Sequence, residues 1–299
     1  MRILSIGNFT TGWDGSICDE EHIAKALEQM GHEVYRMQRE DASVGTIHDY
    51  DNSFIDFVLV AQWDGYPAGA ISEIGVGKMP LVYWAFDYQA DGQEWHERLV
   101  KEADLYLSKR IADSKYKNWR WLSQDFAPEF LSLSPKINQP IDVLFTGSYL
   151  PWAHERNDTL RAIDANFNLV IHSINAWEGF KDVRGPVMDQ GLIDLYAKSK
   201  INISIDHTLE AGYWSDRNAQ IMTCGGFVLF RHIPLSEARF QDKVAYFYSI
   251  DDCLKKIKLY LDSSLKRDII SSQGHLYAKQ NLMVKHRVRD LLTLVEEVL

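Results

Sequence analysis

Residues 201–205 read INISI, and after a polar loop residues 215–230 read SDRNAQIMTCGGFVLF. The first run predicts a strand, residues 216–223 predict a helix that ends at the glycine pair 225–226, and residues 227–230 predict a second strand. A strand, a loop, a helix and a further strand in this order are typical of α/β folds with a parallel sheet. This segment therefore decides the predicted fold class, which is α/β.

Units of the same kind occur in both halves of the chain. Each half opens with an apolar strand that ends in glycine, over residues 2–7 and residues 141–147. Between them, residues 131–140 contain two prolines and no apolar periodicity, so we expect a linker there. The other predicted strands are one that begins at residues 32–35, 54–60, 80–86, 105–107 and 168–172, and the other predicted helices are 19–30 (with Gly31 as its left-handed C-cap), 92–101, 191–198 and 276–299.

These boundaries divide the chain into two Rossmann-like domains and a C-terminal helix. We expect an N-terminal domain over residues 1–138 and a second domain over residues 139–275. The helical pattern over residues 276–299 is expected to pack on the lobes, and it can cross back to the first domain.

The composition of the 299-residue chain is that of a globular protein, with 46% hydrophobic and 25% charged residues. No apolar run approaches the roughly 18 residues of a membrane span, and the apolar part of residues 1–7 is too short for a signal peptide. Cys18, Cys224 and Cys253 are widely spaced and form no C-x-x-C pattern, so they predict neither a disulfide framework nor a zinc site. We expect a cytoplasmic protein.

The charge is distributed unevenly along the chain. Residues 1–140 carry 13 Lys and Arg against 22 Asp and Glu, whereas residues 141–299 carry 19 against 20. An acidic first half repels a polyanion, so the sequence disfavours nucleic acid as a partner of that half. The second half is relatively richer in positive charge, as a domain that holds a diphosphate would be.

The loop before residue 217 has the features of an anion-binding site. In open α/β sheets, ligands bind at the carboxyl ends of parallel strands, and this loop follows such an end. Ser215 or Asp216 is the expected N-cap of the next helix, whose first N–H groups then point at the same crevice. Arg217 adds a planar, bidentate cation that suits a phosphate.

The run SDRNAQIMTCGGFVL (215–229) resembles the signature of GT-B glycosyltransferases. It is most similar to the compact C-terminal domain of the spore-maturation-type (CgeB-like) proteins and of short bacterial family-1 and family-4 transferases. Their pattern continues, in the same order, in VLFTGS (143–148) with Arg156, in LYAKSKIN (195–202), and in HLY (275–277) with HR (286–287). The resemblance covers about residues 140–290; the first half matches more loosely.

This resemblance implies two Rossmann-like domains that face each other across a cleft, with the acceptor on the first and the donor on the second. It implies a glycosyltransferase that moves a sugar from a nucleoside diphosphate sugar to an acceptor hydroxyl without a metal ion. Arg217 and a helix N-terminus would stabilise the leaving diphosphate. The UDP- or GDP-linked sugar is a co-substrate and no cofactor is expected; the acceptor is a glycan, a protein, a lipid-linked sugar or a small molecule.

One position departs from the family pattern. An acidic residue usually follows the arginine by three and is expected to bind the donor ribose, but this chain has Gln220. An amide still hydrogen-bonds a hydroxyl, without the strength of a charged partner. The expected donor-binding residues are Gly12 and Gly15 in the first half, and Gly147, Ser148, His207, Ser215, Asp216, Arg217 and Gln220 in the second.

Two aspartates in the first half are candidates for the acceptor base. Asp14 lies in the loop after the first strand, and Asp87 directly follows the strand 80–86. Both positions adjoin strand ends, where the cleft is expected. If the enzyme retains the anomeric configuration, the donor phosphate assists the attack and neither aspartate need be a base. The sequence leaves this choice open.

Other readings remain at this point. The chain is alternatively a DNA-modifying glycosyltransferase acting on hydroxymethylated bases, a catalytically inactive nucleotide-sugar-binding module, or a sugar-nucleotide 2-epimerase on the same two-lobe plan. Aromatic residues of the first half are further candidates, as platforms for a sugar ring: Trp13, Trp63, Tyr66, Trp84 and Trp95.

Overall fold

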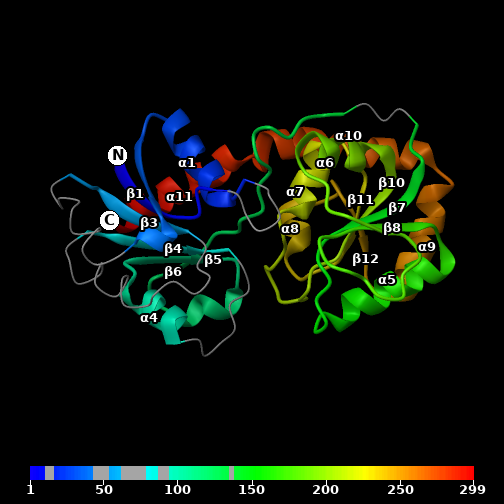
Figure 1. Cartoon of the computed structure of the whole chain (residues 1–299), viewed down its shortest axis with the longest axis horizontal. Coiled ribbons are helices and arrows are strands. Elements are labelled where there is room, and N and C mark those ends of the chain that lie inside the picture. The colour runs from blue at the N-terminus through cyan, green and yellow to red at the C-terminus, as the bar shows by residue number, and fades with distance from the viewer. Residues whose placement is uncertain (11–16, 43–53, 62–78, 87–93, 135–137) are drawn as a thin grey trace. The chain divides into compact units, whose positions relative to one another are not determined.

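A computed structural model describes residues 1–10, 17–42, 54–61, 79–86, 94–134 and 138–299. The chain forms two compact units (Figure 1). The first contains Met1–Gln124 and the C-terminal Val284–Leu299, and the second contains Asp125–Met283. The chain therefore passes between the units twice, after Gln124 and after Met283.

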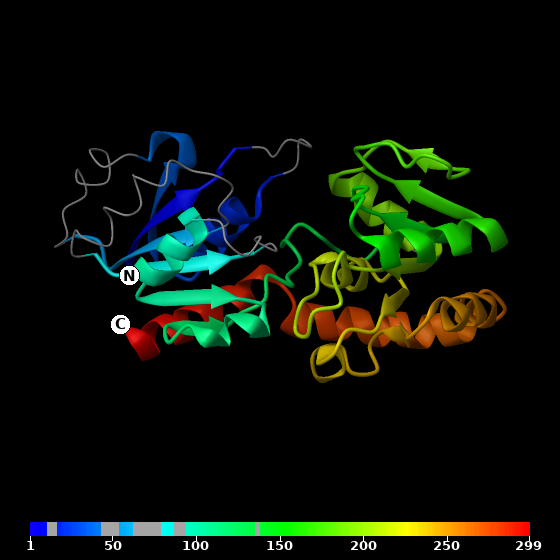
Figure 2. The same ribbon diagram turned by 90° about the horizontal axis from the view of Figure 1, so that it is seen from below.

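The first unit is a parallel six-stranded sheet with helices on both faces. Its strand order is β2-β1-β3-β4-β5-β6. Helices α1 and α11 lie on one face and α4 lies on the other (Figures 1 and 2). All residues of β3 and β4 are buried because both faces of the sheet are covered. The elements are β1 (Arg2–Gly7), α1 (Asp19–Gln29), β2 (Glu33–Gln38), η1 (Arg39–Asp41), β3 (Phe57–Ala61), β4 (Leu81–Ala85), α4 (Glu94–Glu102), β5 (Leu105–Ser108), η2 (Ile111–Lys115), β6 (Trp119–Trp121) and α11 (Val284–Val298).

The second unit repeats this plan with the strand order β12-β11-β10-β7-β8-β9, again with parallel pairing throughout. Helices α5 and α9 pack on one face, and α6 and α7 lie on the other, where α10 packs against α7 (Figure 1). The elements are β7 (Ile141–Thr146), α5 (His154–Asn166), β8 (Leu169–His172), β9 (Val183–Arg184), α6 (Asp189–Lys198), β10 (Ser199–Ser204), α7 (Arg217–Thr223), β11 (Val228–Arg231), α8 (Ser236–Phe240), β12 (Ala245–Phe247), α9 (Ile250–Leu261) and α10 (Ser264–Asn281).

The predicted fold class, α/β with two Rossmann-like domains, is confirmed by these two parallel sheets. The predicted C-cap at Gly31 is also confirmed, since this glycine has φ +88° and closes α1 through hydrogen bonds from its own N–H and that of His32. Glycine ends α7 in the same way. Gly225 has φ +77°, its N–H donates to Met222 O, and the Gly226 N–H donates to Ile221 O.

The helix predicted over residues 276–299 is two helices in the structure. α10 ends at Asn281 and α11 begins at Val284. Between them, Leu282 O accepts from the Ala127 N–H at 2.7 Å, and Met283 forms an isolated parallel bridge with Ala127. The apolar periodicity continues across this break, which is why the sequence pattern does not reveal it. The second of the two helices belongs to the first unit.

The boundary between the two units does not lie in residues 131–140, the segment predicted as a linker. The contact boundary falls after Gln124, and the described residues that follow it pack within the second unit. Asp125 is fully buried, and Leu131 is 1% exposed. The polar composition of residues 131–140 thus does not mark the point where the chain changes unit.

Candidate active site

Strand order in the second unit reverses between β7 and β10. From β7 the chain builds outward through β8 and β9, and from β10 it builds the other way through β11 and β12. Loops that leave two such neighbouring strands diverge to opposite faces, which opens a crevice at their carboxyl ends. The loop after β7 begins at Gly147, and the loop after β10 begins at Ile205.

Arg217, the first residue of α7, reaches into this crevice. Its Nε donates to the carbonyl of Thr146, the last residue of β7, at 2.9 Å. Its Nη1 lies 3.5 Å from both the carbonyl of Ile205 and Oδ1 of Asp206, directly after β10, and 3.3 Å from Ser215 Oγ. The guanidinium also lies over the Phe145 ring. One side chain thus joins the ends of both strands at the crevice.

Two of the three guanidinium nitrogens of Arg217 contact described residues, and the third, Nη2, does not. Within the described part of the chain, Nη2 makes no hydrogen bond, and the Arg217 side chain is 14% exposed. A Cβ at Gly147 would lie 3.0 Å from Nη2 and 3.2 Å from the Phe145 ring. Any larger residue at Gly147 would therefore crowd the guanidinium, which accounts for glycine at this position.

A second arginine lies near the first. Arg156, from the first turn of α5, is 4% exposed and donates to the Ser148 carbonyl at 2.8 Å. Its guanidinium is 5.8 Å from the ring centroids of Phe145 and Trp177. Burial, and next the positive charge of Arg217, lower the pKa of Arg156 to about 10. Two guanidiniums are thus held close together at a site with little solvent.

Asp206 supplies the nearest negative charge. Its side chain is 2% exposed, Oδ1 contacts Arg217, and its charge favours the protonated form of Arg156. Its other oxygen, Oδ2, has no partner among the described residues. Asp206 was not among the predicted site residues. It directly follows the predicted strand 201–205, just as the predicted Asp87 directly follows the strand 80–86.

Several polar atoms around this crevice are buried without a hydrogen bond inside the described part of the chain. They are Arg156 Nε, Asp206 Oδ2 and both amide atoms of Asn218, which is fully buried beside Arg217. Folded proteins leave few such atoms because each costs about 1–3 kcal/mol.

The start of α7 differs from the prediction. Asp216 has helical dihedral angles (φ −64°, ψ −17°) and its side chain does not cap the helix. Its Oδ2 instead accepts a hydrogen bond from Gln220 Nε2, one turn along the helix. The side chain of Ser215 accepts from Arg217. The expected cap is therefore wrong, and Asp216 and Gln220 form a pair.

Residues 155–293 match a protein-family model described as "Glycosyl transferase-like". The match runs from α5 into α11 and covers most of the second unit, which is called the glycosyl transferase-like domain here. No functionally curated protein matches the chain by sequence.

Solved structures share the fold of nearly the whole chain. HepE of Anabaena, solved with UDP, is 13% identical with a TM-score of 0.67, over 99% of this chain and 100% of that one. An alpha-glucosyltransferase solved with UDP and a mismatched 13-mer DNA is 11% identical with a TM-score of 0.70 (99% and 100%). Sucrose-phosphate synthase of Thermosynechococcus elongatus is 10% identical with a TM-score of 0.70 (99% and 98%). With the family match, these confirm the predicted class, a glycosyltransferase of the GT-B type.

The glycosyl transferase-like domain brings most of the predicted donor residues to one edge of its sheet. Gly147 and Ser148 follow β7, His207 follows β10, and Ser215 precedes α7. The His207 ring packs edge-on against Tyr213, 5.1 Å away, within the same loop. Arg231, at the carboxyl end of β11, forms an ion pair with Glu155, whereas Lys198 lies at the amino end of β10, away from this edge.

The structure describes few of the site residues that were predicted in the first half of the chain. Asp14, Asp87, Gly12 and Gly15 lie outside the described residues, as do Trp13, Trp63, Tyr66 and the Trp95 side chain. Trp84 is described and is 0% exposed, with its indole N–H donating to the Leu122 carbonyl. The expectation that Trp84 offers a platform to a sugar is therefore wrong, because its ring is part of the core.

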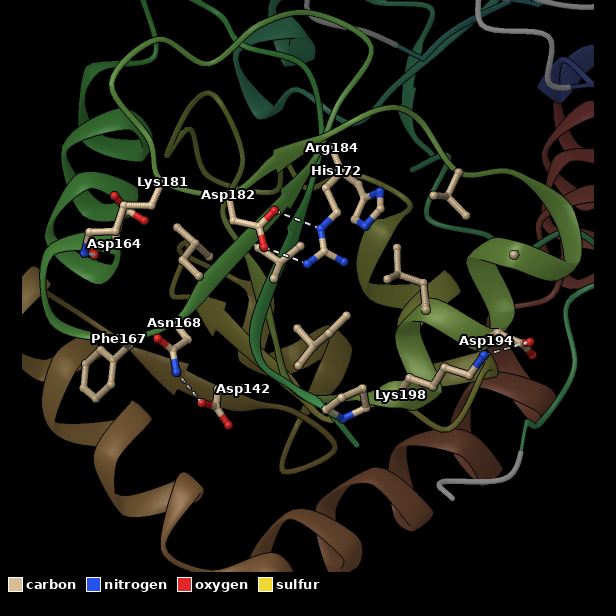
Figure 3. Close-up of a pocket in the computed structure, with 17 residues that line it drawn as sticks. Asp142, Asp164, Phe167, Asn168, His172, Lys181, Asp182, Arg184, Asp194 and Lys198 are labelled. Atoms are coloured by element: carbon tan, nitrogen blue, oxygen red, sulfur yellow. Dashed lines mark hydrogen bonds and ion pairs between the residues drawn. The ribbon is translucent and has the colours of Figure 1, made fainter. Parts of the chain in front are cut away.

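A separate cavity of about 720 Å³ lies in the glycosyl transferase-like domain beside β8 and β9 (Figure 3). Four of its charged side chains form two ion pairs, Asp182 with Arg184 and Asp194 with Lys198 (dashed lines in Figure 3). None of the predicted donor residues lines it. We therefore place the candidate site at the crevice between β7 and β10.

No described helix is both long and apolar enough to cross a bilayer. Among the described residues, no three His, Cys, Asp or Glu side chains gather closely enough to hold a metal ion.

Proposed function

We propose that this protein transfers a sugar from a nucleoside diphosphate sugar to an acceptor hydroxyl, with the donor diphosphate on Arg217. The observation that carries the proposal is the position of Arg217, joined to the ends of β7 and β10 where the strand order reverses. The neighbours solved with UDP or UDP-glucose support uridine as the base to test first.

The chemistry requires positive charge where the leaving diphosphate develops negative charge. A phosphate oxygen beside Gly147 would accept from Arg217 Nη2, and the buried charge of Arg156 would act on it through a region of low dielectric. The first turn of α7 begins at the same place and adds its N–H groups. Because two guanidiniums supply the positive charge, we propose that the transfer needs no metal ion and that EDTA does not inhibit it.

The acceptor hydroxyl would be deprotonated by a group outside this cluster. Asp14 and Asp87 remain our candidates for that base, because each follows a predicted strand of the first half. Whether the transfer inverts or retains the anomeric configuration decides whether a base is needed. NMR of the anomeric proton of the product decides between the two.

Calorimetric titration with UDP, GDP and their glucose conjugates tests the proposal. We expect one nucleoside diphosphate to bind with a Kd in the micromolar range and UDP-glucose or GDP-glucose to be hydrolysed slowly without acceptor. Binding without any hydrolysis or transfer would favour an inactive binding module. The proposal fails if none of the four ligands binds.

The pair of Asp216 and Gln220 leads to a prediction about the ribose. We propose that Asp216, whose carboxylate Gln220 holds one turn before the usual acidic position, accepts from a ribose hydroxyl. A hydrogen bond to a charged group contributes about 1.5–3 kcal/mol, so the wild type should prefer UDP over 2′-deoxy-UDP or 3′-deoxy-UDP by about 10-fold. Asp216→Asn should reduce that preference below about 3-fold in the same titration.

Gln220→Ala is the matched variant for this prediction. It removes the donor that orients Asp216 but keeps the carboxylate, so we expect a preference between those of the wild type and Asp216→Asn. An unchanged preference for the ribose hydroxyl in Asp216→Asn would contradict the assignment, whatever the affinity for UDP itself.

The DNA-modifying alternative remains a weaker proposal. Its support is the fold shared with glucosyltransferases solved on DNA. Against it stands the excess of acidic residues in the first half of the chain, which would repel a duplex. A gel shift with hydroxymethylated duplex at moderate salt separates the two, since a DNA-modifying enzyme must bind that duplex.

A further inference from the structure

Trp152 is the most exposed of the described tryptophans, at 65%. It lies in the loop between β7 and α5. Within the described part of the chain its ring has no aromatic or cationic partner, in contrast to the exposed Tyr248, whose ring is tilted against that of His232 with 4.7 Å between the centroids. An indole left in water forgoes about 1.5–3 kcal/mol of burial, so the position calls for an explanation.

The loop that carries Trp152 is held firmly. The backbone N–H and C=O of Tyr149 both hydrogen-bond to the side chain of Asn175, at 2.7 and 3.0 Å. The Leu150 carbonyl accepts from the Ala153 N–H and from Asn157 Nδ2. Because both flanks are fixed in this way, the indole is presented at a defined place rather than on a loose tip.

This loop is continuous with the proposed donor site. It starts at Gly147, which lies against Arg217, and the Ser148 carbonyl accepts from Arg156. Polar side chains follow the indole directly: His154 is exposed, and the Glu155 side chain is 43% exposed in its ion pair with Arg231. An exposed aromatic ring with polar acceptors and donors within three residues of it in the chain is a combination suited to a pyranose, whose C–H face packs on the ring while its hydroxyls hydrogen-bond.

We infer that Trp152 is a stacking platform for a pyranose ring bound beside the donor diphosphate. The inference rests on the proposed function, because it uses the donor site to locate the ring. The same chemistry fits two sources, namely the sugar of the donor and a sugar of the acceptor. Trp152 contributes the apolar face, and Glu155 and His154 offer hydrogen bonds to hydroxyls.

The experiment compares wild type, Trp152→Ala and Trp152→Phe, with Leu276→Ala as a control for loss of an exposed apolar side chain on α10, which is 61% exposed. Calorimetry measures the Kd values for UDP and UDP-glucose. Saturation-transfer NMR measures contact with methyl glucoside, methyl galactoside and methyl N-acetylglucosaminide, with and without UDP. Because Trp152 packs on little, we expect all variants to fold with the wild-type Tm.

A donor sugar on the platform predicts that Trp152→Ala weakens UDP-glucose by about 5- to 10-fold and leaves UDP unchanged. An acceptor sugar predicts that both Kd values stay unchanged while the saturation-transfer signal of a glycoside falls at least 5-fold. Trp152→Phe should retain part of either effect. The inference is overturned if the alanine variant weakens UDP and UDP-glucose equally, which places the ring on the base, or if it changes nothing.

The failure of this inference and the failure of the proposed function are distinguishable. A wild type that binds no nucleotide contradicts the proposed function. In that case the glycoside arm without UDP still decides whether Trp152 contacts a pyranose.

Discussion

Arg217→Ala is expected to raise the Kd for UDP by about 100-fold. The wild-type guanidinium is already fixed by Thr146, Ile205 and Asp206, so it binds a phosphate without losing further side-chain freedom. Two charge-assisted hydrogen bonds to phosphate, at about 1.5–3 kcal/mol each, exceed the 2.7 kcal/mol that corresponds to 100-fold. Isothermal calorimetry at constant ionic strength measures the change.

Arg217→Lys tests the geometry rather than the charge. A lysine keeps the positive charge but has no Nε–H that could donate to Thr146 O while a second nitrogen meets the ligand. We expect it to recover less than a tenth of the lost affinity. Arg161→Ala, an exposed arginine on α5, is the matched control and should bind UDP as the wild type does. An Arg217→Ala protein that binds UDP within 3-fold of the wild type would contradict the site.

The segment that decides the fold was predictable because its signals are local. The strand at residues 201–205, the helix from Arg217 and the glycines that end it depend on patterns within one turn or one pleat. Gly225 and Gly226 show this well: a positive φ is needed at the first, and a Cβ on the second would lie 2.6 Å from Ile221 Cγ2. The position of Arg217 at the carboxyl end of a strand follows from the same local order.

The neighbours of Arg217 were not predictable in the same way. Asp206 and Arg156 are separated by 50 positions and meet only because β7 and β10 are adjacent in the sheet. Arg156 was noted as part of a family pattern, but burial of its charge depends on the packing of Phe145 and Trp177 around it. The break at Met283 is likewise invisible in the periodicity, because a contact with Ala127 fixes it.

These two arginines differ in what they contribute to the folded state. Arg217 is partly exposed and makes four polar contacts. Arg156 is buried with its Nε unpartnered among the described residues, and it makes one hydrogen bond, to Ser148 O. A charge buried at a cost and next to a like charge is retained in proteins mainly where a ligand needs it. We therefore expect Arg156 to contribute to ligand binding and not to the stability of the fold.

Arg156→Met is expected to weaken UDP binding by about 10-fold while changing the free energy of unfolding by less than about 1 kcal/mol. The lowering of the Arg156 pKa to about 10 corresponds to a cost of about 3 kcal/mol for the charged form, and its removal roughly offsets the contacts that are lost with methionine. Urea unfolding and calorimetry measure the two quantities, with Arg161→Met as control. A loss of several kcal/mol of stability at unchanged affinity would make Arg156 a structural residue.

The pH dependence of unfolding tests the same cost independently. Below pH 10 the folded and unfolded states both hold the Arg156 proton, so the folded state carries the full cost. Above about pH 10 the folded state releases the proton before the unfolded state does, so the contribution of this group to stability increases as the pH rises. Arg156→Met lacks this group. As the pH is raised from 9 to 11, the free energy of unfolding of the wild type should therefore increase relative to that of the variant. A difference that stays constant over this range would mean that burial does not lower the pKa of Arg156. The expectation that Arg156 serves binding at a cost in stability would then have no physical basis.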